Sequence, residues 1–156
     1  MPTKLSSLFF PILVLAAGVL EASSAVAAPA SACSLLSRAA IARATGLHVD
    51  RGREGPSLAG SLSDCTWVGA DGTRIVVTLA DSAHMQVTLD SEIQSGATEY
   101  PGIGTRAAGT AGNEETEGGY NLSILDPKGG VAVSILGKAG TGERAVALAK
   151  SIETRR

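Results

Sequence analysis

Two cysteines carry the clearest chemistry in this sequence. Cys33 and Cys65 are its only thiols, and paired thiols in an oxidising compartment close as a disulfide. We expect that bond here. Closing the loop between the two cysteines should stabilise the fold by about 3.7 kcal/mol, because it lowers the entropy of the unfolded chain. A zinc site is not expected, because it needs four ligands and no histidine pair accompanies the two cysteines.

A second chemistry for Cys33 is lipid attachment. Ser31 and Ala32 are the small residues that usually precede a lipid-attachment cysteine, but Ala30 stands where a large aliphatic residue is usual. Lipidation would also leave Cys65 as an unpaired thiol. The disulfide is therefore favoured, and a lipid anchor through Cys33 is the alternative.

Catalytic chemistry is only weakly indicated. Ser82 and Asp81 stand beside His84, but a Ser-His-Asp site requires a geometry that neighbours in sequence do not supply. An acidic segment with Glu114, Glu115 and Glu117 has carboxylates suited to calcium, yet a solvated loop is the simpler expectation. We expect no catalytic residues, no metal and no cofactor, and a small hydrolase is the least favoured hypothesis. The other histidine, His48, is expected on the surface like His84.

Three aromatic residues are the candidate binding residues. Trp67, Tyr100 and Tyr120 are the only aromatics after Phe10. Trp67 stands two residues after Cys65, which puts both side chains on the same face of a strand. Tryptophan is highly buried on average, so packing against the disulfide is the favoured expectation for Trp67. The functional alternative makes all three the walls of an apolar ligand groove.

The N-terminal segment is typical of a signal peptide. Lys4 precedes an apolar run from Leu8 to Leu20, and Ala25-Val26-Ala27 is an A-x-A cleavage site. Glu21 ends the run short of the roughly 20 residues that a membrane span needs. We expect residues 1–27 to be removed, with cleavage sites up to 32 as alternatives. A single domain over 28–156 would then be secreted or periplasmic, without membrane insertion.

Composition excludes some partners. The formal net charge is −2, too mild for the electrostatic footprint of a protein that binds nucleic acid or anionic lipid. We expect an unknown protein or small molecule of the cell envelope as partner.

The elements that would position these residues follow from hydrophobic periodicity and turn residues. Helices are expected over 37–45, 81–95 and 141–155, with a strand as the alternative for 81–95. Hairpins are expected over 64–80 and 120–136, a short strand over 105–108 and a loop over 48–63. Short turns give an antiparallel sheet, and alternating strands need a helical cover. We predict an α+β fold: a sheet of about four to six strands with the N- and C-terminal helices packed on one face.

The order of these motifs resembles a family of small exported proteins. The shared features are Cys33-Ser34-Leu35-Leu36-Ser37 before a helix that ends at Gly46, Cys65-Thr66-Trp67, Pro101-Gly102-Ile103-Gly104 and a late Ala-Leu-Ala-Lys at 147–150. They are similar to secreted or lipid-anchored proteins of actinobacterial type, grouped as a domain of unknown function with a PsbP-like α/β fold. The resemblance implies a fold and brings no activity, cofactor or catalytic residues.

The expected function is accordingly that of an exported, non-catalytic binding or interaction module. A structural or inhibitory protein of the cell envelope is the alternative. That alternative predicts an exposed apolar patch of roughly a few hundred Å².

Overall fold

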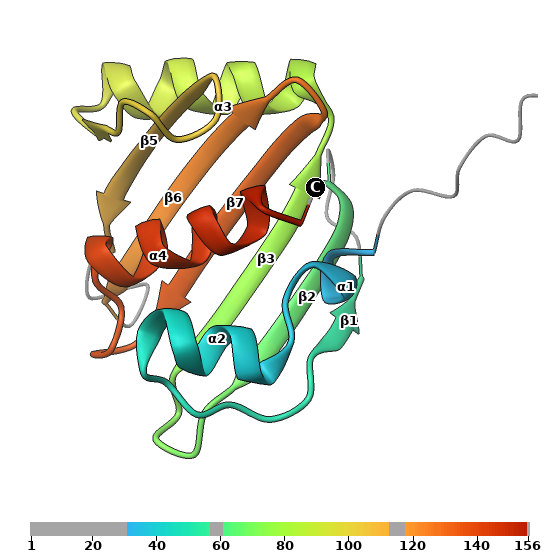
Figure 1. Ribbon diagram of the computed structural model, residues 1–156. Coiled ribbons are helices and arrows are strands. Elements are labelled where there is room, and N and C mark those ends of the chain that lie inside the picture. The colour runs from blue at the N-terminus through green and yellow to red at the C-terminus, as the bar shows by residue number, and fades with distance from the viewer. Residues whose placement is uncertain (1–30, 57–60, 113–117, 156) are drawn as a thin grey trace, which may run out of the picture.

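The computed structural model describes residues 31–56, 61–112 and 118–155 of the 156-residue chain. Within these ranges one antiparallel sheet has the strand order β1-β2-β3-β7-β6-β5-β4, and four helices accompany it (Figure 1). The strands are β1 (Arg53–Gly55), β2 (Ser61–Val68), β3 (Arg74–Ala80), β4 (Thr98–Glu99), β5 (Arg106–Ala111), β6 (Gly119–Asp126) and β7 (Gly129–Leu136). The helices are α1 (Ala32–Leu35), α2 (Arg38–Thr45), α3 (Ser82–Gln94) and α4 (Gly142–Glu153).

The α+β class is confirmed, and the strand count is corrected. The sheet has seven strands where four to six were expected. The unpredicted members are β1 and β4, of three and two residues, and they form the two edges of the sheet. Strands this short carry no alternating apolar pattern, so sequence periodicity had nothing to detect.

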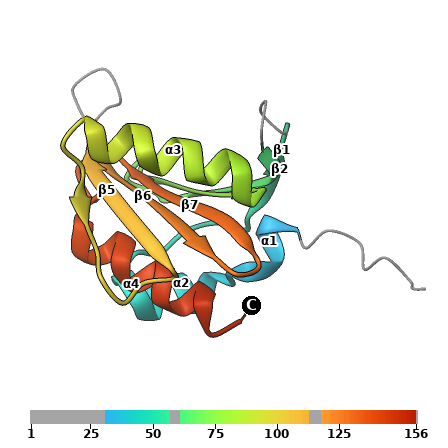
Figure 2. The same cartoon turned by 90° about the horizontal axis from the view of Figure 1, so that it is seen from above.

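The two faces of the sheet are covered by different helices and carry different core clusters. Figure 2 shows α3 on one face and α2 and α4 on the other. A small cluster of Ala80, Met85, Leu89 and Ala108 lies on the α3 side. The main core lies on the opposite side, and its largest members are Trp67, Ile41, Ile75, Leu122, Ile124, Ile135, Leu148 and Ile152.

A row of paired residues crosses the main-core face. Trp67 on β2 stands opposite Ile75 on β3, Ile75 opposite Ile135 on β7, and Ile135 opposite Tyr120 on β6. Three spacings between neighbouring strands separate Trp67 from Tyr120 by about 14 Å. These two aromatic residues therefore lie at opposite ends of the row, with two buried isoleucines between them.

Local sequence signals explain the helices. Ser37 caps α2 by accepting a hydrogen bond from the Ala40 amide at 3.2 Å. Gly46 ends that helix with φ of 73°, in the left-handed region that favours glycine. Asp81 caps α3 by accepting from the His84 amide at 2.7 Å, which confirms helix over strand for this segment. In α4 the residues predicted at helical spacing are all buried: Ala145, Leu148, Ala149 and Ile152.

No helix among the residues described has both the length and the apolar character to cross a membrane.

Candidate functional site

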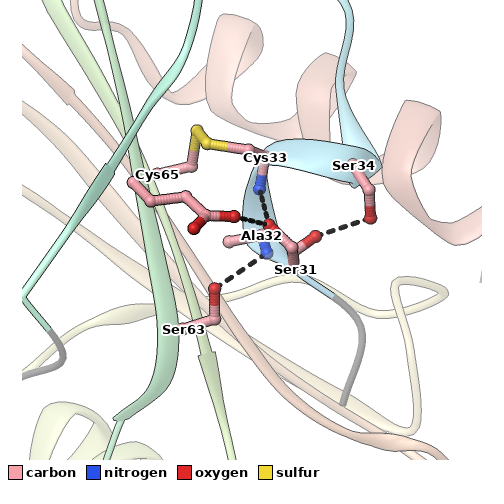
Figure 3. The surroundings of a disulfide bond; sticks show 7 residues. Ser31, Ala32, Cys33, Ser34, Ser63 and Cys65 are labelled. Atoms are coloured by element: carbon pink, nitrogen blue, oxygen red, sulfur yellow. Dashed lines mark hydrogen bonds between the residues drawn. A yellow bond between two sulfur atoms is a disulfide. The ribbon is translucent and has the colours of Figure 1, made fainter. Parts of the chain in front are cut away.

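The disulfide joins α1 to β2. Cys33 and Cys65 are bonded, with Cα atoms 5.0 Å apart and 32 residues of separation along the chain. Figure 3 shows the bond between the short helix and the strand. Cys65 is fully buried, and Cys33 is half-buried. The predicted pairing is confirmed, and one of its sulfurs lies near the surface.

Residues just before Cys33 belong to the folded domain. The Ser31 hydroxyl accepts a hydrogen bond from the Cys33 amide at 3.2 Å and donates one to the Glu54 carboxylate on β1. The Ala32 amide donates to the Ser63 hydroxyl at 3.0 Å, and the Ala32 side chain is fully buried (Figure 3). The short helix α1 was not predicted, because its four residues follow directly on a run of small residues.

A hollow of about 610 Å³ opens beside the disulfide. Three segments meet there: α1 with the start of α2, β1 with the chain leading into it, and β2. The residues around the hollow are Cys33, Leu36, Ser37 and Arg38 from the first segment, Arg51, Gly52 and Glu54 from the second, and Trp67 from the third. Its size lies within the usual range for small-molecule sites.

Trp67 forms the base of this hollow and is not an open stacking surface. Its side chain is only 1% exposed. The backbone of Gly52 lies directly on the ring, since a Cβ at Gly52 would come within 2.6 Å of Trp67 Nε1 and 2.8 Å of Cys65 Sγ. Glycine is therefore required at position 52 by close approach, and the favoured expectation of core packing for Trp67 agrees with its burial.

The two tyrosines lie elsewhere and contact each other. The hydroxyls of Tyr100 and Tyr120 are 2.6 Å apart, and the Tyr100 hydroxyl and the Tyr120 ring lie against Gly142 at the start of α4. Burial, followed by the hydrogen bond with Tyr100, raises the pKa of Tyr120 above its ordinary value. The structure thus brings Trp67 to the hollow and leaves Tyr100 and Tyr120 as a separate, mutually bonded pair.

The histidines stand apart from any acid–base constellation in the described part of the chain. His48 and His84 are both exposed. Asp81 caps the helix by accepting from the His84 backbone amide, so its carboxylate bonds to the backbone and not to the imidazole. A smaller hollow of about 250 Å³ includes His48 and Asp71, but the Asp71 carboxylate is held in the turn by the Thr73 amide and hydroxyl, at 3.0 and 2.9 Å. These hydrogen bonds lower the pKa of Asp71.

The acidic segment falls largely outside the described residues, which include none of Glu114, Glu115 and Glu117. Among the residues that are described, no three His, Cys, Asp or Glu side chains gather as metal ligands would.

One carboxyl group away from the hollow is unusually placed. Glu92 lies on the inner side of α3, where its Oε1 accepts from the Ser123 hydroxyl at 2.9 Å. Its Oε2 is buried and has no hydrogen-bond partner within the described ranges. Burial raises the pKa of Glu92, while the bond from Ser123 acts in the opposite direction. On the same helix, Asp90 pairs with the Arg106 guanidinium at 2.6 Å.

Exposed large apolar side chains are few and scattered where the chain is described. They are Leu62 and Val68 on β2 and Val87 on α3. Six residues along a strand separate Leu62 from Val68 by about 20 Å.

Comparison of this chain with protein-family models, curated proteins and solved structures finds no match in any of the three.

Sequence reasoning identified the disulfide and Trp67 but missed most of the hollow. Arg38, Arg51, Gly52 and Glu54 lie in segments that sequence treats as helix surface and loop. Only pairing of β1 with β2, which places Glu54 opposite Cys65, brings the loop residues to the disulfide. The one available signal was the position of Arg51 and Glu54 within the disulfide loop itself.

Proposed function

We propose that this protein is an exported, non-catalytic binding module whose ligand site is the hollow beside the disulfide. The observation that carries the proposal is the hollow itself. It is about 610 Å³ in volume, and its lining combines an apolar base at Trp67 with charged groups at Arg38, Arg51 and Glu54. A site with an apolar body and a few convergent polar groups is the usual form of a small-molecule pocket.

The fold supports a stable frame for such a site. The disulfide fixes α1 on β2, and the Gly52 backbone is held against the tryptophan ring. Because the base and one wall are anchored in the core, a ligand would enter a preformed site and would pay little ordering entropy.

Export as a free protein is part of the proposal, and the position of the first described residues supports it. Lipid attachment would require cleavage directly before Cys33 and would use its sulfur. That processing would remove Ser31 and Ala32, together with the helix cap and the bond to Ser63. We therefore place cleavage upstream of Ser31, as the A-x-A site at 25–27 predicts.

Intact mass spectrometry of the exported protein tests the processing. We expect a mature chain that begins between residues 28 and 31, with the mass of one disulfide and no acyl groups. A chain that begins at Cys33 and carries a lipid would contradict this part of the proposal.

Ligand titrations of the disulfide-bonded mature protein test the binding function. Trp67 is the single tryptophan of the chain, so its fluorescence reports on the hollow, and amide NMR signals of Ser37, Arg51 and Gly52 locate the ligand. A panel of neutral, cationic and anionic small molecules should include a class that shifts these signals saturably. Amides of Gly104 and Lys128, which border a separate hollow of about 260 Å³, serve as the internal control. Shifts of equal size at both places, or none with any class, would contradict the proposal.

A further inference from the structure

Two guanidinium groups stand at the hollow without partners. Arg38 extends from the first turn of α2, and Arg51 from the chain before β1. Both are exposed, and neither has a hydrogen bond or an ion pair with any described residue. A guanidinium is always charged and presents donors in a planar fork that matches carboxylate and phosphate oxygens.

Among the described residues of the lining, Glu54 is the only carboxylate, and it is already engaged. Glu54 accepts the hydrogen bond from the Ser31 hydroxyl. With two arginines against one glutamate, the lining carries a formal charge of +1, although the chain as a whole carries −2. The hollow is thus a local positive site on a mildly acidic protein.

The rest of the lining is compact and largely apolar. Leu36 and Trp67 are buried, and Cys33 is half-buried in its disulfide. Because Leu36 and Trp67 are almost fully buried, the groups that an occupant meets are the two guanidiniums, which favour an anionic head. On the proposed function that this hollow is the ligand site, we infer that it binds a small organic oxyanion, a carboxylate or a phosphate ester, held by Arg38 and Arg51.

Ser31 and Glu54 tune this site. The negative charge of Glu54 repels an anion in the hollow. The hydrogen bond from the Ser31 hydroxyl occupies one oxygen of the Glu54 carboxylate. Glu54→Gln should therefore strengthen anion binding by about two- to threefold, the size of an exposed charge interaction. Ser31→Ala, which leaves the Glu54 carboxylate free to turn toward the arginines, should weaken it by a similar factor.

Matched ligands separate charge from shape. We would titrate the ¹⁵N-labelled, disulfide-bonded mature protein with cyclohexanecarboxylate, cyclohexyl phosphate and the neutral cyclohexanecarboxamide, at low and high salt. Both anions should shift the amides of Ser37, Arg51 and Gly52, and the amide should bind at least tenfold more weakly. High salt should weaken the two anions and leave the carboxamide unchanged, since exposed charges are screened.

Matched variants locate the binding groups. Arg38→Ala and Arg51→Ala should each weaken anion binding about tenfold or more, the loss expected for a charge-assisted hydrogen bond. Arg43→Ala is the control, because Arg43 is an exposed arginine of the same helix outside the lining of the hollow. Amide spectra of all three variants check that the fold is retained.

Several results would overturn the inference. An equal loss of anion affinity in Arg43→Ala would mean that binding depends on the overall positive charge near α2 and not on the two arginines of the hollow. Equal affinity for the carboxamide and the carboxylate would support a binding function of the hollow and would contradict its selectivity for anions. Absence of any shift by either anion at 20 mM would reject the anion site, and the neutral and cationic ligands of the panel would then decide the proposed function separately.

Discussion

The backbone of Gly52 lies on the indole of Trp67 so closely that a Cβ at position 52 would stand 2.6 Å from both Cε2 and Nε1 of the ring. The contact joins the chain before β1 to the core beneath the hollow. A tryptophan ring that is 1% exposed cannot move aside without disturbing the residues packed around it.

Gly52→Ala should therefore destabilise the protein by about 1–3 kcal/mol, the usual cost of overpacking a filled site. Denaturant unfolding followed by tryptophan fluorescence measures the change. Gly55→Ala is the matched control, because among the described residues a Cβ there would meet only Asp64 Cβ, at an ordinary 3.8 Å. Equal effects of the two substitutions would show that the close approach at Gly52 does not matter for stability.

The disulfide should contribute about 3–4 kcal/mol to the free energy of unfolding, from the entropy of closing its loop in the unfolded chain. Unfolding with and without reductant measures this contribution. The double variant Cys33→Ala, Cys65→Ala should lose a similar amount and become insensitive to reductant. Two free thiols in the mature protein under non-reducing conditions would contradict the bond itself.

Ionisation of Glu92 should lower the free energy of unfolding as the pH rises above the ordinary pKa of a glutamate. Burial raises the pKa of this carboxyl in the folded state above 4.5, so the folded protein binds the proton more tightly than the unfolded chain. Its favourable contribution is then complete below pH 4.5 and is lost as pH rises through the folded pKa. Glu92→Gln, which mimics the protonated group, should remove this dependence and raise stability at neutral pH.

Asp90 provides the contrast for that measurement. The side-chain hydrogen bond from Arg106 lowers the pKa of Asp90 below 3.8, so its contribution is present above that pH and is lost as pH falls through the lower folded pKa. Asp90→Asn should change how the free energy of unfolding depends on pH below 3.8. It should leave unchanged the dependence above pH 4.5 that comes from Glu92. Carboxyl ¹³C NMR titration assigns each group, and a Glu92 signal that titrates at or below 4.5 would refute the first prediction.

The tyrosine pair should resist ionisation. Burial and the hydrogen bond with Tyr100 raise the pKa of Tyr120 above 10, so its phenolate should form only in stronger alkali. Ultraviolet absorbance of the phenolate measures this cleanly, because the chain has two tyrosines. Tyr100→Phe removes the contributions of Tyr100 and should move the pKa of Tyr120 back toward 10, without reaching it while the ring stays half-buried. An unchanged titration in Tyr100→Phe would contradict a role for the hydrogen bond.

Much of the fold could be predicted from local signals. The cap at Ser37, the stop at Gly46 and the apolar stripe of α4 each depend on a few adjacent residues, and the two hairpins depend on alternation and on turn residues. These features are written in short stretches of sequence, so they appear in the structure close to where they were expected.

The candidate site could be predicted only in part, because it is made by long-range contacts. Cysteine parity in an expected export product was enough to pair Cys33 with Cys65. The arginines had no such signal, since Arg38 looks like a helix-surface residue and Arg51 like a loop residue until β1 pairs with β2. Shared aromatic character also grouped Tyr120 with Trp67, whereas register places these two at opposite ends of one row.

The placement of the disulfide bears on how the chain matures. Cys33 and Cys65 both precede β3, whereas β7, which joins β3 to the other half of the sheet, is built from residues near the C-terminus. A chain threaded through an export channel with its N-terminus first would deliver both thiols before β7 arrives. The crosslink can then be made on a half-translocated chain, and two cysteines allow a single intramolecular pairing. On such a route, oxidation could not lock the domain in a wrong intramolecular disulfide, and no disulfide-shuffling step would be needed.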